Sequence, residues 1–417
     1  MTPITHLADL AGSFRPGTAV VVHTGCAAPP LLSAQLVELS EAAGPFRLFD
    51  LCTIGRPRFL PGIESGALRL TTFVPGKAVR QALSGGKIEV VRRPLSEAPA
   101  YIAGDGFAPD ILLLHLSRAK DQDGYSLGVS VDVMRAALRR ARLVVAEINP
   151  NMPWTSGDTQ VRADEIDYFL ESDAPLQSVV LAEGDATDTA IADHLAGLIR
   201  NGDVLQLGIG SISDLTAQRL GHCHDLGLHT GIITEAVQPL IERGAITNAT
   251  KSAFRGRSIA TMAAGSPGFY EFLNDNPVVE FHPCDLTHSQ AVLAAVPQLC
   301  TINSALEIDL SAQVNAEYLR GRPVSGPGGQ PDFARAAASM SGGKSIIALR
   351  AASKDGGLSR ILPRLDCPAT ITARDVTHVV TEYGVARIAG LSGSALQAAL
   401  ADIAAPQFRD DLRRAPT

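Results

Sequence analysis

Short runs of consecutive apolar residues alternate with amphipathic stretches along most of this chain. Consecutive apolar positions are typical of strands buried on both faces, whereas apolar positions three and four apart are typical of helices. The runs predict strands at residues 18–23, 46–51, 68–73, 87–91, 110–117 and 142–149, and then at 204–210, 226–230, 258–265, 299–310, 344–350, 369–373 and 378–384. Helices are predicted between them, for example at 29–43 and 128–141. This alternation indicates an α/β fold of parallel sheets with helices on their faces.

The length of the chain indicates two sheets rather than one. A chain of 417 residues is longer than a single hydrophobic core usually supports. Near residues 175–190 the polar, extended passage SDAPLQSVVLAEGDATDTA precedes the predicted helix AIADHLAGLIR. We therefore predict two α/β domains of similar size, at residues 1–182 and 183–417.

Charge and cysteine content narrow the class of protein. Lysine and arginine total 36 against 43 aspartate and glutamate residues, which gives a net charge of −7. This balance argues against a broad cationic surface for nucleic acid and leaves room for a local basic pocket. The six cysteines have no paired spacing, as is typical of reduced cytosolic thiols. With no signal peptide or membrane-spanning run in the pattern, we expect a cytoplasmic enzyme without nucleic-acid or membrane partners.

A glycine-rich turn, QLGIGSISD at residues 206–214, follows one predicted strand and precedes a helix that we expect to begin at Asp214. Gly208 and Gly210 expose backbone N–H groups at a helix N-terminus, where such groups bind a phosphate or a developing oxyanion. The third glycine of the dinucleotide-binding fingerprint is missing. From the residues alone, an anion-binding loop and an ordinary strand-to-helix turn are equally open interpretations.

A second glycine-rich turn, VSGPGGQPDFARAA, spans residues 324–337. Three glycines and two prolines give a stiff, kinked backbone that allows close approach to a ligand. Donation of N–H groups to a carbonyl oxygen is one interpretation. A plain connection between two elements is the other, and spacing alone slightly favours it.

The cluster His222-Cys223-His224 is the nearest approach to a metal-binding pattern in the sequence. No second pair of ligands follows it at zinc spacing, so we interpret it as a surface turn. We therefore predict no metal site.

Ordered blocks that carry a family resemblance run almost from end to end of the chain. They are RPLSEAPAYI (93–102), APDILLLHLSRAKDQDGYSLGVSVD (108–132), AEINPNMPWTSGDTQV (146–161), NGDVLQLGIGSISD (201–214), DLGLHTG (225–231), GAITNATK (244–251), GSPGFYEFLNDNPVVEF (265–281), INSALEIDLSAQVNAE (302–317), GPGGQPDFARAA (326–337), SGGKSIIAL (341–349) and VVTEYGVARIAG (379–390). Together these blocks resemble the acetyl-CoA hydrolase/transferase family, which includes 4-hydroxybutyrate and butyrate–acetate CoA-transferases.

The resemblance implies two related open α/β domains with the active site in the interdomain cleft, and a homodimer or larger homo-oligomer. It implies a small acyl-CoA and an acceptor as partners, so that coenzyme A enters as the acyl-CoA substrate, with no metal. In the family a glutamate attacks the thioester, and CoA returns to form a glutamyl-CoA thioester that passes CoA to a second carboxylate. A carboxylate nucleophile divides one difficult exchange into two easier ones.

The same resemblance assigns roles to the two glycine-rich turns. Their backbone N–H groups stabilise the tetrahedral oxyanions, and the donors map here to Ile209 and to Gly328 or Gly329. Residues of the same blocks are expected to line the substrate and CoA, and they are Gln206, Gly208, Gly210, Asn303, Gly326, Gln330, Asp332 and Lys344. Of these, Lys344 is expected near the CoA phosphates.

The position that corresponds to the catalytic glutamate holds a glycine in this chain. The family pattern H-[ST]-E-M-x-[ST]-D-G aligns with HTGIITEA at residues 229–236, which places Gly231 on the glutamate and Glu235 on the following aspartate. Glu235 lies at a predicted helix start, where a carboxylate commonly favours the helix dipole. Covalent catalysis tolerates such a displacement poorly. A glutamyl-CoA adduct at residue 231 is excluded.

Three interpretations of this departure remain. In the first, the chain is a CoA-transferase that recruits Glu235 or another carboxylate. In the second, the acyl group passes directly to water or to an amine, hydroxyl or carbon nucleophile, with His229 or Glu235 as the base, although His229 equally fits a structural role. In the third, the chain is a non-catalytic acyl-CoA binder. We expect an acyl-CoA-utilising enzyme of the CoA-transferase family that acts on a small acyl-CoA thioester.

Overall fold

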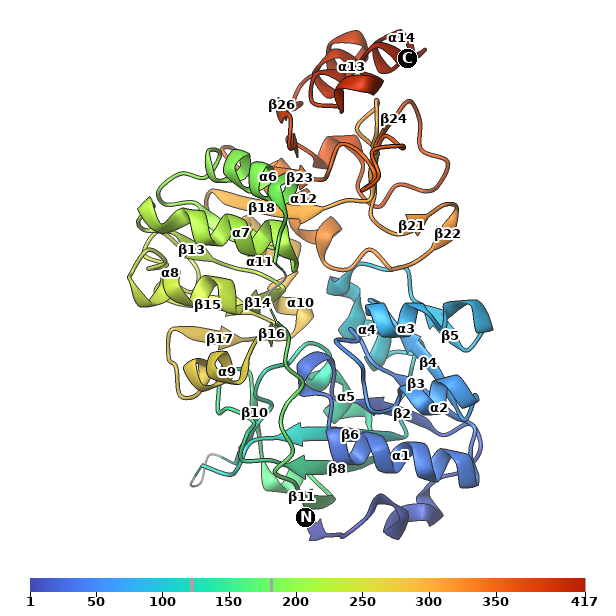
Figure 1. Ribbon diagram of the computed structural model, residues 1–417. Helices are drawn as coiled ribbons and strands as arrows, with labels where there is room; N and C mark the ends of the chain where they lie inside the picture. The colour runs from blue at the N-terminus through green and yellow to red at the C-terminus, as the bar shows by residue number, and fades with distance from the viewer. Residues whose placement is uncertain (121–123, 181–182, 417) are drawn as a thin grey trace. The chain divides into compact units, whose positions relative to one another are not determined.

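The strands predicted for the first half of the chain form one parallel sheet in the computed structural model (Figure 1). The structure describes residues 1–120, 124–180 and 183–416. From edge to edge the sheet runs β1 (Thr2–Pro3), β11 (Tyr168–Glu171), β8 (Leu143–Ile148), β6 (Ile111–Leu116), β2 (Ala19–Val22), β3 (Phe46–Phe49), β4 (Leu68–Thr72) and β5 (Ile88–Val90). Strands β2 and β6 are buried at every position, because helices cover both faces of the sheet.

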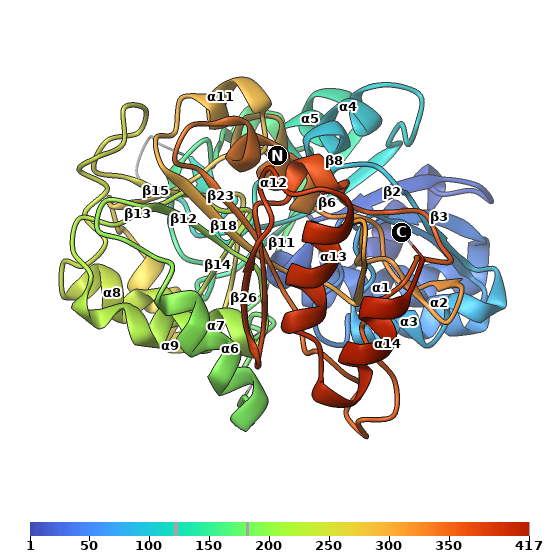
Figure 2. The ribbon, with the colours of Figure 1, turned by 90° about the horizontal axis from the view of Figure 1, so that it is seen from above.

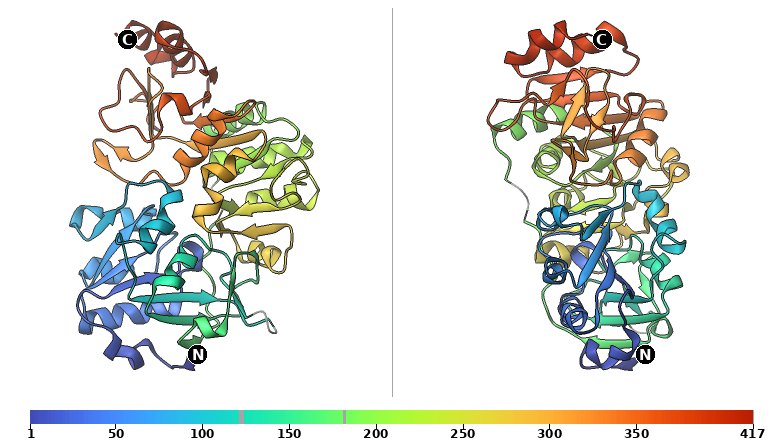
Figure 3. Two further views of the ribbon diagram at one scale, coloured as in Figure 1. Left: turned by 180° about the vertical axis from the view of Figure 1, so that it is seen from behind. Right: turned by 90° about the vertical axis from the view of Figure 1, so that its right-hand side faces the viewer.

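Helices α1 (Pro30–Ala43), α2 (Leu60–Ser65) and α3 (Lys77–Arg80) pack on one face of this sheet. Helices α4 (Ala98–Ala103) and α5 (Met134–Arg140) lie on the other face, as Figures 2 and 3 show. The helix predicted at 29–43 is confirmed. The one predicted at 128–141 is confirmed only in its second half, since Gly128 has φ +61° and the helix begins at Met134.

Residues 259–287 belong to the same structural unit as residues 1–180. In this segment β17 (Val279–Phe281) pairs with β9 (Ser156–Gly157), and helix α9 (Pro267–Leu273) precedes it. The predicted second domain, 183–417, differs from the structure here, because the strand pairing joins segments that are far apart in sequence. The predicted boundary falls directly after residue 182, which lies outside the described residues.

The second unit, formed by the rest of the described chain, is built around another mostly parallel sheet. Its strands run in the order β13 (Gly227–Leu228), β12 (Val204–Leu207), β18 (Leu299–Ser304), β23 (Lys344–Ala348), β25 (His378–Thr381) and β26 (Gly384–Arg387). Neighbouring strands are parallel except in the β25–β26 hairpin. The carboxyl ends of β13, β12 and β18 therefore share one edge, which is where open α/β sheets bind ligands.

Helices also cover both faces of the second sheet (Figure 2). Helices α6 (Ala186–Ala196) and α7 (Ser211–Arg219) lie on one face, and α11 (Gln290–Ala294) and α12 (Gln330–Ser339) pack on the other through a core that includes Phe333. The C-terminal part adds α13 (Gly393–Asp402), α14 (Arg409–Arg414) and a small sheet of β20 (Val314–Asn315), β19 (Glu307–Asp309) and β24 (Ile361–Leu362). The remaining α-helices and strands of the described residues are β7 (Tyr125–Ser126), β10 (Gln160–Val161), β14 (Ile232–Thr234), α8 (Gln238–Glu242), β15 (Ser258–Ala260), β16 (Met262–Ala264), α10 (Cys284–Thr287), β21 (Tyr318–Leu319) and β22 (Arg322–Pro323).

The strands predicted for the second unit are confirmed in part. Those at 204–210, 344–350 and 378–384 appear as the shorter β12, β23 and β25. The one at 369–373 is wrong, because only Ile371 forms a bridge there and no ladder follows. In the part of the chain that the structure describes, no helix has both the length and the apolar character needed to cross a membrane.

Candidate active site

Three predicted site residues lie on or just after neighbouring strands, near the carboxyl edge of the second sheet. Gln206 lies on β12, Asn303 on β18, and His229 directly after β13. The Gln206 amide donates to Asn303 Oδ1 at 3.2 Å, and the Asn303 amide donates to Gln206 Oε1 at 3.0 Å. Both side chains are buried. This reciprocal pair satisfies two buried amides and fixes their orientation at the edge.

The first glycine-rich loop, Gly208–Gly210, leaves β12 at this edge and leads into α7. The Gly208 N–H donates to the Ile302 carbonyl at 3.1 Å. Gly210 has φ +123°, a conformation that residues with a Cβ rarely adopt. Ile209 between them is 56% exposed, and among the described residues no hydrogen bond uses its backbone N–H. The loop therefore presents the Ile209 N–H just before a helix N-terminus, whereas the Gly208 N–H, which the sequence predicts to be exposed, is taken up by the Ile302 carbonyl.

The second loop, residues 326–329, precedes α12. The Gln330 amide donates to the Ser304 carbonyl at 2.9 Å, which fastens the loop to the carboxyl end of β18. Gly328 has φ +62°. Within the described ranges, the N–H groups of Gly328 and Gly329 donate to no protein acceptor. The structure thus places the two glycine-rich loops at the ends of adjacent strands, β12 and β18.

A residue that the sequence analysis does not select, His288, lies against two of the predicted glycines. A Cβ atom on Gly231 would lie 2.9 Å from His288 Nε2, and a Cβ atom on Gly329 would lie 2.5 Å from the same nitrogen. His288 is 1% exposed, and its ring packs edge-on against Phe333 with centroids 4.9 Å apart. One imidazole ring therefore occupies the space beside both glycines, and a side chain at position 231 requires that ring to move.

His229 belongs to the same group of rings. Its side chain is fully buried, with ring centroids 6.3 Å from Phe254 and 6.3 Å from Phe333. Phe333 therefore contacts both His229 and His288. A signal for Phe333 is present in the sequence, since it lies one helical turn after Gly329, whereas no local pattern indicates His288.

Glu235 is separated from Gly231 by β14. It is half-buried and begins a short 3₁₀ helix, η8 (Glu235–Val237), so its predicted place at a helix start is confirmed. Its role as a replacement nucleophile stays a prediction.

Lys344 lies at the opposite edge of the sheet from the glycine-rich loops. It is the first residue of β23, and its Nζ is 2.5 Å from the carboxylate of Asp203, which directly precedes β12. Both side chains are largely buried, so the ion pair explains the lysine without a ligand. The structure does not bring Lys344 to the other candidates. Two predicted binding residues remain, Gly326 and Asp332, and both are buried. The backbone carbonyl of Asp332 accepts a hydrogen bond from the Gln290 amide at 2.7 Å.

Asp214 is a titratable group beside the first loop. Helix α7 begins at Ser211 rather than at Asp214, because the Asp214 N–H already donates to the Gly210 carbonyl at 3.1 Å. Its carboxyl group accepts the Thr234 hydroxyl at 3.2 Å. Burial raises the pKa of Asp214 to about 6, and the Thr234 hydrogen bond offsets only part of this effect.

This shift predicts how stability depends on pH. Between pH 3.8 and about 6 the folded protein keeps the Asp214 proton that the unfolded chain loses, so stability falls as the pH rises through this window. We expect Asp214→Asn to flatten this fall and to stabilise the protein at pH 7 by about 1 kcal/mol, a value discounted for solvent screening. Thermal unfolding from pH 4 to 7 measures it. Asp410→Asn, on an exposed residue of α14, should keep the wild-type slope, and an equal slope in both variants would contradict the prediction.

One group among the described residues has metal-ligand atoms within 4.8 Å of one another, namely Glu307, Asp366 and Cys367. Glu307 accepts the Asn315 amide at 2.8 Å, and Asp366 is exposed. Exposed acidic groups of this kind are common without an ion, so the cluster carries no assignment. His222 and His224 are exposed on either side of a buried cysteine, which confirms the predicted surface turn.

Models of protein families match both halves of the chain. The acetyl-CoA hydrolase/transferase N-terminal domain matches residues 4–180, and the C-terminal domain of the same name matches residues 265–415. The chain is 36% identical over 340 residues to the 4-hydroxybutyrate coenzyme A transferase of Clostridium kluyveri, which covers 81% of this chain and 79% of that protein.

Solved structures with similar folds cover nearly the whole chain. RipA from Yersinia pestis matches with a TM-score of 0.93 and 29% identity, over 99% of this chain and 96% of that chain. A 4-hydroxybutyrate CoA-transferase from Porphyromonas gingivalis matches with a TM-score of 0.83 and 30% identity over the same shares.

Proposed function

Because this chain belongs to the acetyl-CoA hydrolase/transferase family, we propose that it is an acyl-CoA transferase that acts on the thioester of a small acyl-CoA. Coenzyme A then enters as the acyl-CoA substrate, and an acid is the first acceptor to test. The relatives from Clostridium kluyveri and Porphyromonas gingivalis, both 4-hydroxybutyrate CoA-transferases, support this proposal.

One observation carries the proposal beyond the family match. The backbone N–H groups of Ile209 and of Gly328 and Gly329 donate to no acceptor among the described residues. Attack on a thioester carbonyl places negative charge on its oxygen, and preorganised N–H donors stabilise that charge more than they stabilise the ground state. The two glycine-rich loops are therefore the proposed oxyanion donors.

The nucleophile is the part of the mechanism in which this chain departs from the family pattern. Gly231 offers no carboxylate, and the ring of His288 fills the space beside it. We place no glutamyl-CoA intermediate at position 231. Glu235 is the carboxylate that a conventional transferase mechanism would have to recruit.

Direct acyl transfer is kept as the second candidate function, because the imidazole of His288 lies against Gly231. An imidazole is the side chain most often used as a general base, and a protic acceptor could be activated by it. The acceptor would lose its proton to the base as it attacks the thioester carbonyl, and the released CoA thiolate would take that proton up. Water, a hydroxyl or an amine are the acceptors that fit this route.

The test is to incubate the purified protein with a panel of short acyl-CoAs, with and without acetate or a simple amine. Free CoA, new acyl-CoA and the intact-protein mass are followed together. Acetyl-CoA that forms only with acetate supports the transferase, and a covalent CoA adduct would then point to Glu235. Release of CoA without an adduct, and faster with an amine, supports direct transfer. No turnover with any acyl-CoA contradicts both functions and leaves a non-catalytic binder.

Assembly and location are further parts of the proposal. The resemblance supports a homo-oligomer, and all six cysteines are free thiols, which suits a cytoplasmic protein. Light scattering of the purified protein at several concentrations tests the first part, and cell fractionation tests the second.

A further inference from the structure

The residue that follows the first glycine-rich loop is held by a buried carboxylate. The Ser211 hydroxyl donates to Asp188 Oδ2 at 2.8 Å. Asp188 lies in the first turn of α6 and its side chain is 5% exposed, whereas Ile209 in the loop is 56% exposed. The exposed loop is thus attached, where it joins α7, to the buried carboxylate of Asp188.

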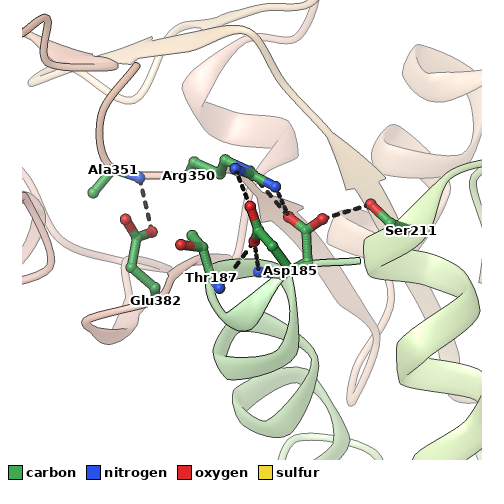
Figure 4. A network of polar contacts seen from close by, with 7 residues as sticks. Asp185, Thr187, Ser211, Arg350, Ala351 and Glu382 are labelled. Carbon is green, nitrogen blue, oxygen red and sulfur yellow. Dashed lines mark hydrogen bonds and ion pairs between the residues drawn. The ribbon is translucent and has the colours of Figure 1, made fainter. Parts of the chain in front are cut away.

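Arg350 holds the other oxygen of Asp188. Its Nε and Nη2 donate to Asp188 Oδ1 at 3.0 and 2.7 Å, and its Nη1 donates to Asp185 Oδ2 at 2.9 Å. Asp185 also caps α6, because its Oδ1 accepts the Thr187 and Asp188 N–H groups at 3.0 and 3.1 Å. Figure 4 shows the hydrogen bonds between Arg350 and the start of α6. Ser211, at the start of α7, donates to the carboxylate of Asp188.

The backbone next to Arg350 is also held by a hydrogen bond. The Ala351 N–H, next to Arg350 in the chain, donates to the Glu382 carboxylate at 2.9 Å, and Glu382 directly follows β25. The links from Arg350 to Asp188 and Asp185 are charge-assisted hydrogen bonds, which are roughly twice as strong as neutral ones. Since both oxygens of Asp188 are bonded, its carboxylate serves as an anchor rather than as a base.

We propose that Asp188 and Arg350 are positioning residues that set the orientation of the loop Gly208–Gly210, and with it the direction of the Ile209 N–H. This inference rests on the proposed function, in which that N–H binds the oxyanion. Among the described residues, and apart from its chain neighbours, no heavy atom lies within 4 Å of the place where a Gly210 side chain would begin, so no side chain packs against the loop at that point. An oxyanion donor must be held within about 0.5 Å of its productive position. Ser211 is the first residue after the loop, and its hydrogen bond to Asp188 holds this end of the loop in place.

Kinetics of matched variants test the proposal. Ser211→Ala removes one hydrogen bond, and Asp188→Ala removes the whole anchor. We expect each to lower kcat for an acyl-CoA about 10-fold with KM changed less than about twofold, because the donor acts in the transition state. The double variant should be no slower than Asp188→Ala alone, since both changes break the same contact. Ser211→Thr keeps the hydroxyl and should retain most of kcat.

Asp193→Ala is the matched control. Asp193 lies on the same helix as Asp188 and pairs with Arg219, so it joins α6 to α7 away from the loop. The Asp193→Ala variant should keep kcat within about twofold of the wild-type value. An Asp193→Ala variant that loses kcat as much as Asp188→Ala would reduce the anchor to ordinary helix packing and overturn the proposal.

Hydrogen–deuterium exchange separates this inference from the proposed function. In Ser211→Ala and Asp188→Ala, exchange should rise in peptides that cover residues 208–217, which include the first turn of α7, and it should not rise there in Asp193→Ala. If wild type turns over no acyl-CoA, the proposed function fails, and raised exchange still supports the anchor. Unchanged exchange in both variants overturns the anchor whatever the activity.

Discussion

A glutamate introduced at position 231 is expected to form no covalent CoA adduct and to destabilise the second unit by about 1–3 kcal/mol, the usual cost of overpacking. Its Cβ would lie 2.9 Å from Nε2 and 3.2 Å from Cε1 of His288. The same ring also lies against Gly329, whose own Cβ would lie 2.5 Å from Nε2. Intact-protein mass after incubation with acyl-CoA tests for the adduct, and thermal unfolding measures the stability.

Truncation of His288 is expected to reverse this result. In a Gly231→Glu/His288→Ala variant the carboxylate gains room, and a mass increase equal to CoA less one water should appear with acyl-CoA. Gly197→Glu is the control, because Gly197 is exposed with φ −66° and the nearest atom to its Cβ position is 3.5 Å away. It should gain no adduct and keep the wild-type stability. A CoA adduct on the single Gly231→Glu variant would show that His288 does not close this space.

Phe333→Ala is expected to cost about 3–5 kcal/mol, as truncation of a buried phenylalanine usually does. Phe333 is 1% exposed, lies in the core between α12 and β12, and contacts the rings of His288 and His229. For a unit of this size the loss corresponds to a fall in Tm of roughly 10 °C. We also expect a large loss of turnover, because Phe333 supports the ring beside Gly231.

Thermal unfolding and the acyl-CoA assay measure the two effects of Phe333→Ala. Phe408→Ala is the matched control in the same unit. Phe408 is only partly buried and packs against a hydrophobic core that includes Leu400 and Leu412. It should lower Tm by a smaller amount and leave turnover unchanged. Equal losses in both variants would mean that the position of Phe333 beside the histidines has no special effect.

The hydrophobic pattern predicts the two sheets well, because parallel strands covered by helices on both faces are apolar at consecutive positions. Strands β2 and β6 are examples, with every position buried. The edge strand β1 is exposed, so no apolar run marks it. The residues 369–373 have strand-like composition, yet they form a single bridge, because no neighbouring strand extends the ladder.

Pairing between distant segments explains the other differences. The pattern assigns residues 259–287 to the second domain, whereas β17 pairs with β9 and brings the segment into the first unit. Lys344 lies in a block that resembles the family, but the strand register places it beside Asp203 at the amino edge of the sheet. Register and pairing partners depend on the whole sheet, so local composition does not predict them.

The sequence by itself determined the features that depend on local backbone chemistry. These are the alternation of strands and helices, the two glycine-rich loops, and the absence of a carboxylate at Gly231. Only the tertiary structure decided what surrounds them. His288 comes to lie against Gly231 and Gly329, and Asp188 and Arg350 hold the loop that ends at Gly210. The physical reason is that a glycine turn is specified by its own residues, whereas a side-chain contact between distant segments exists only once the sheet and its helices have packed.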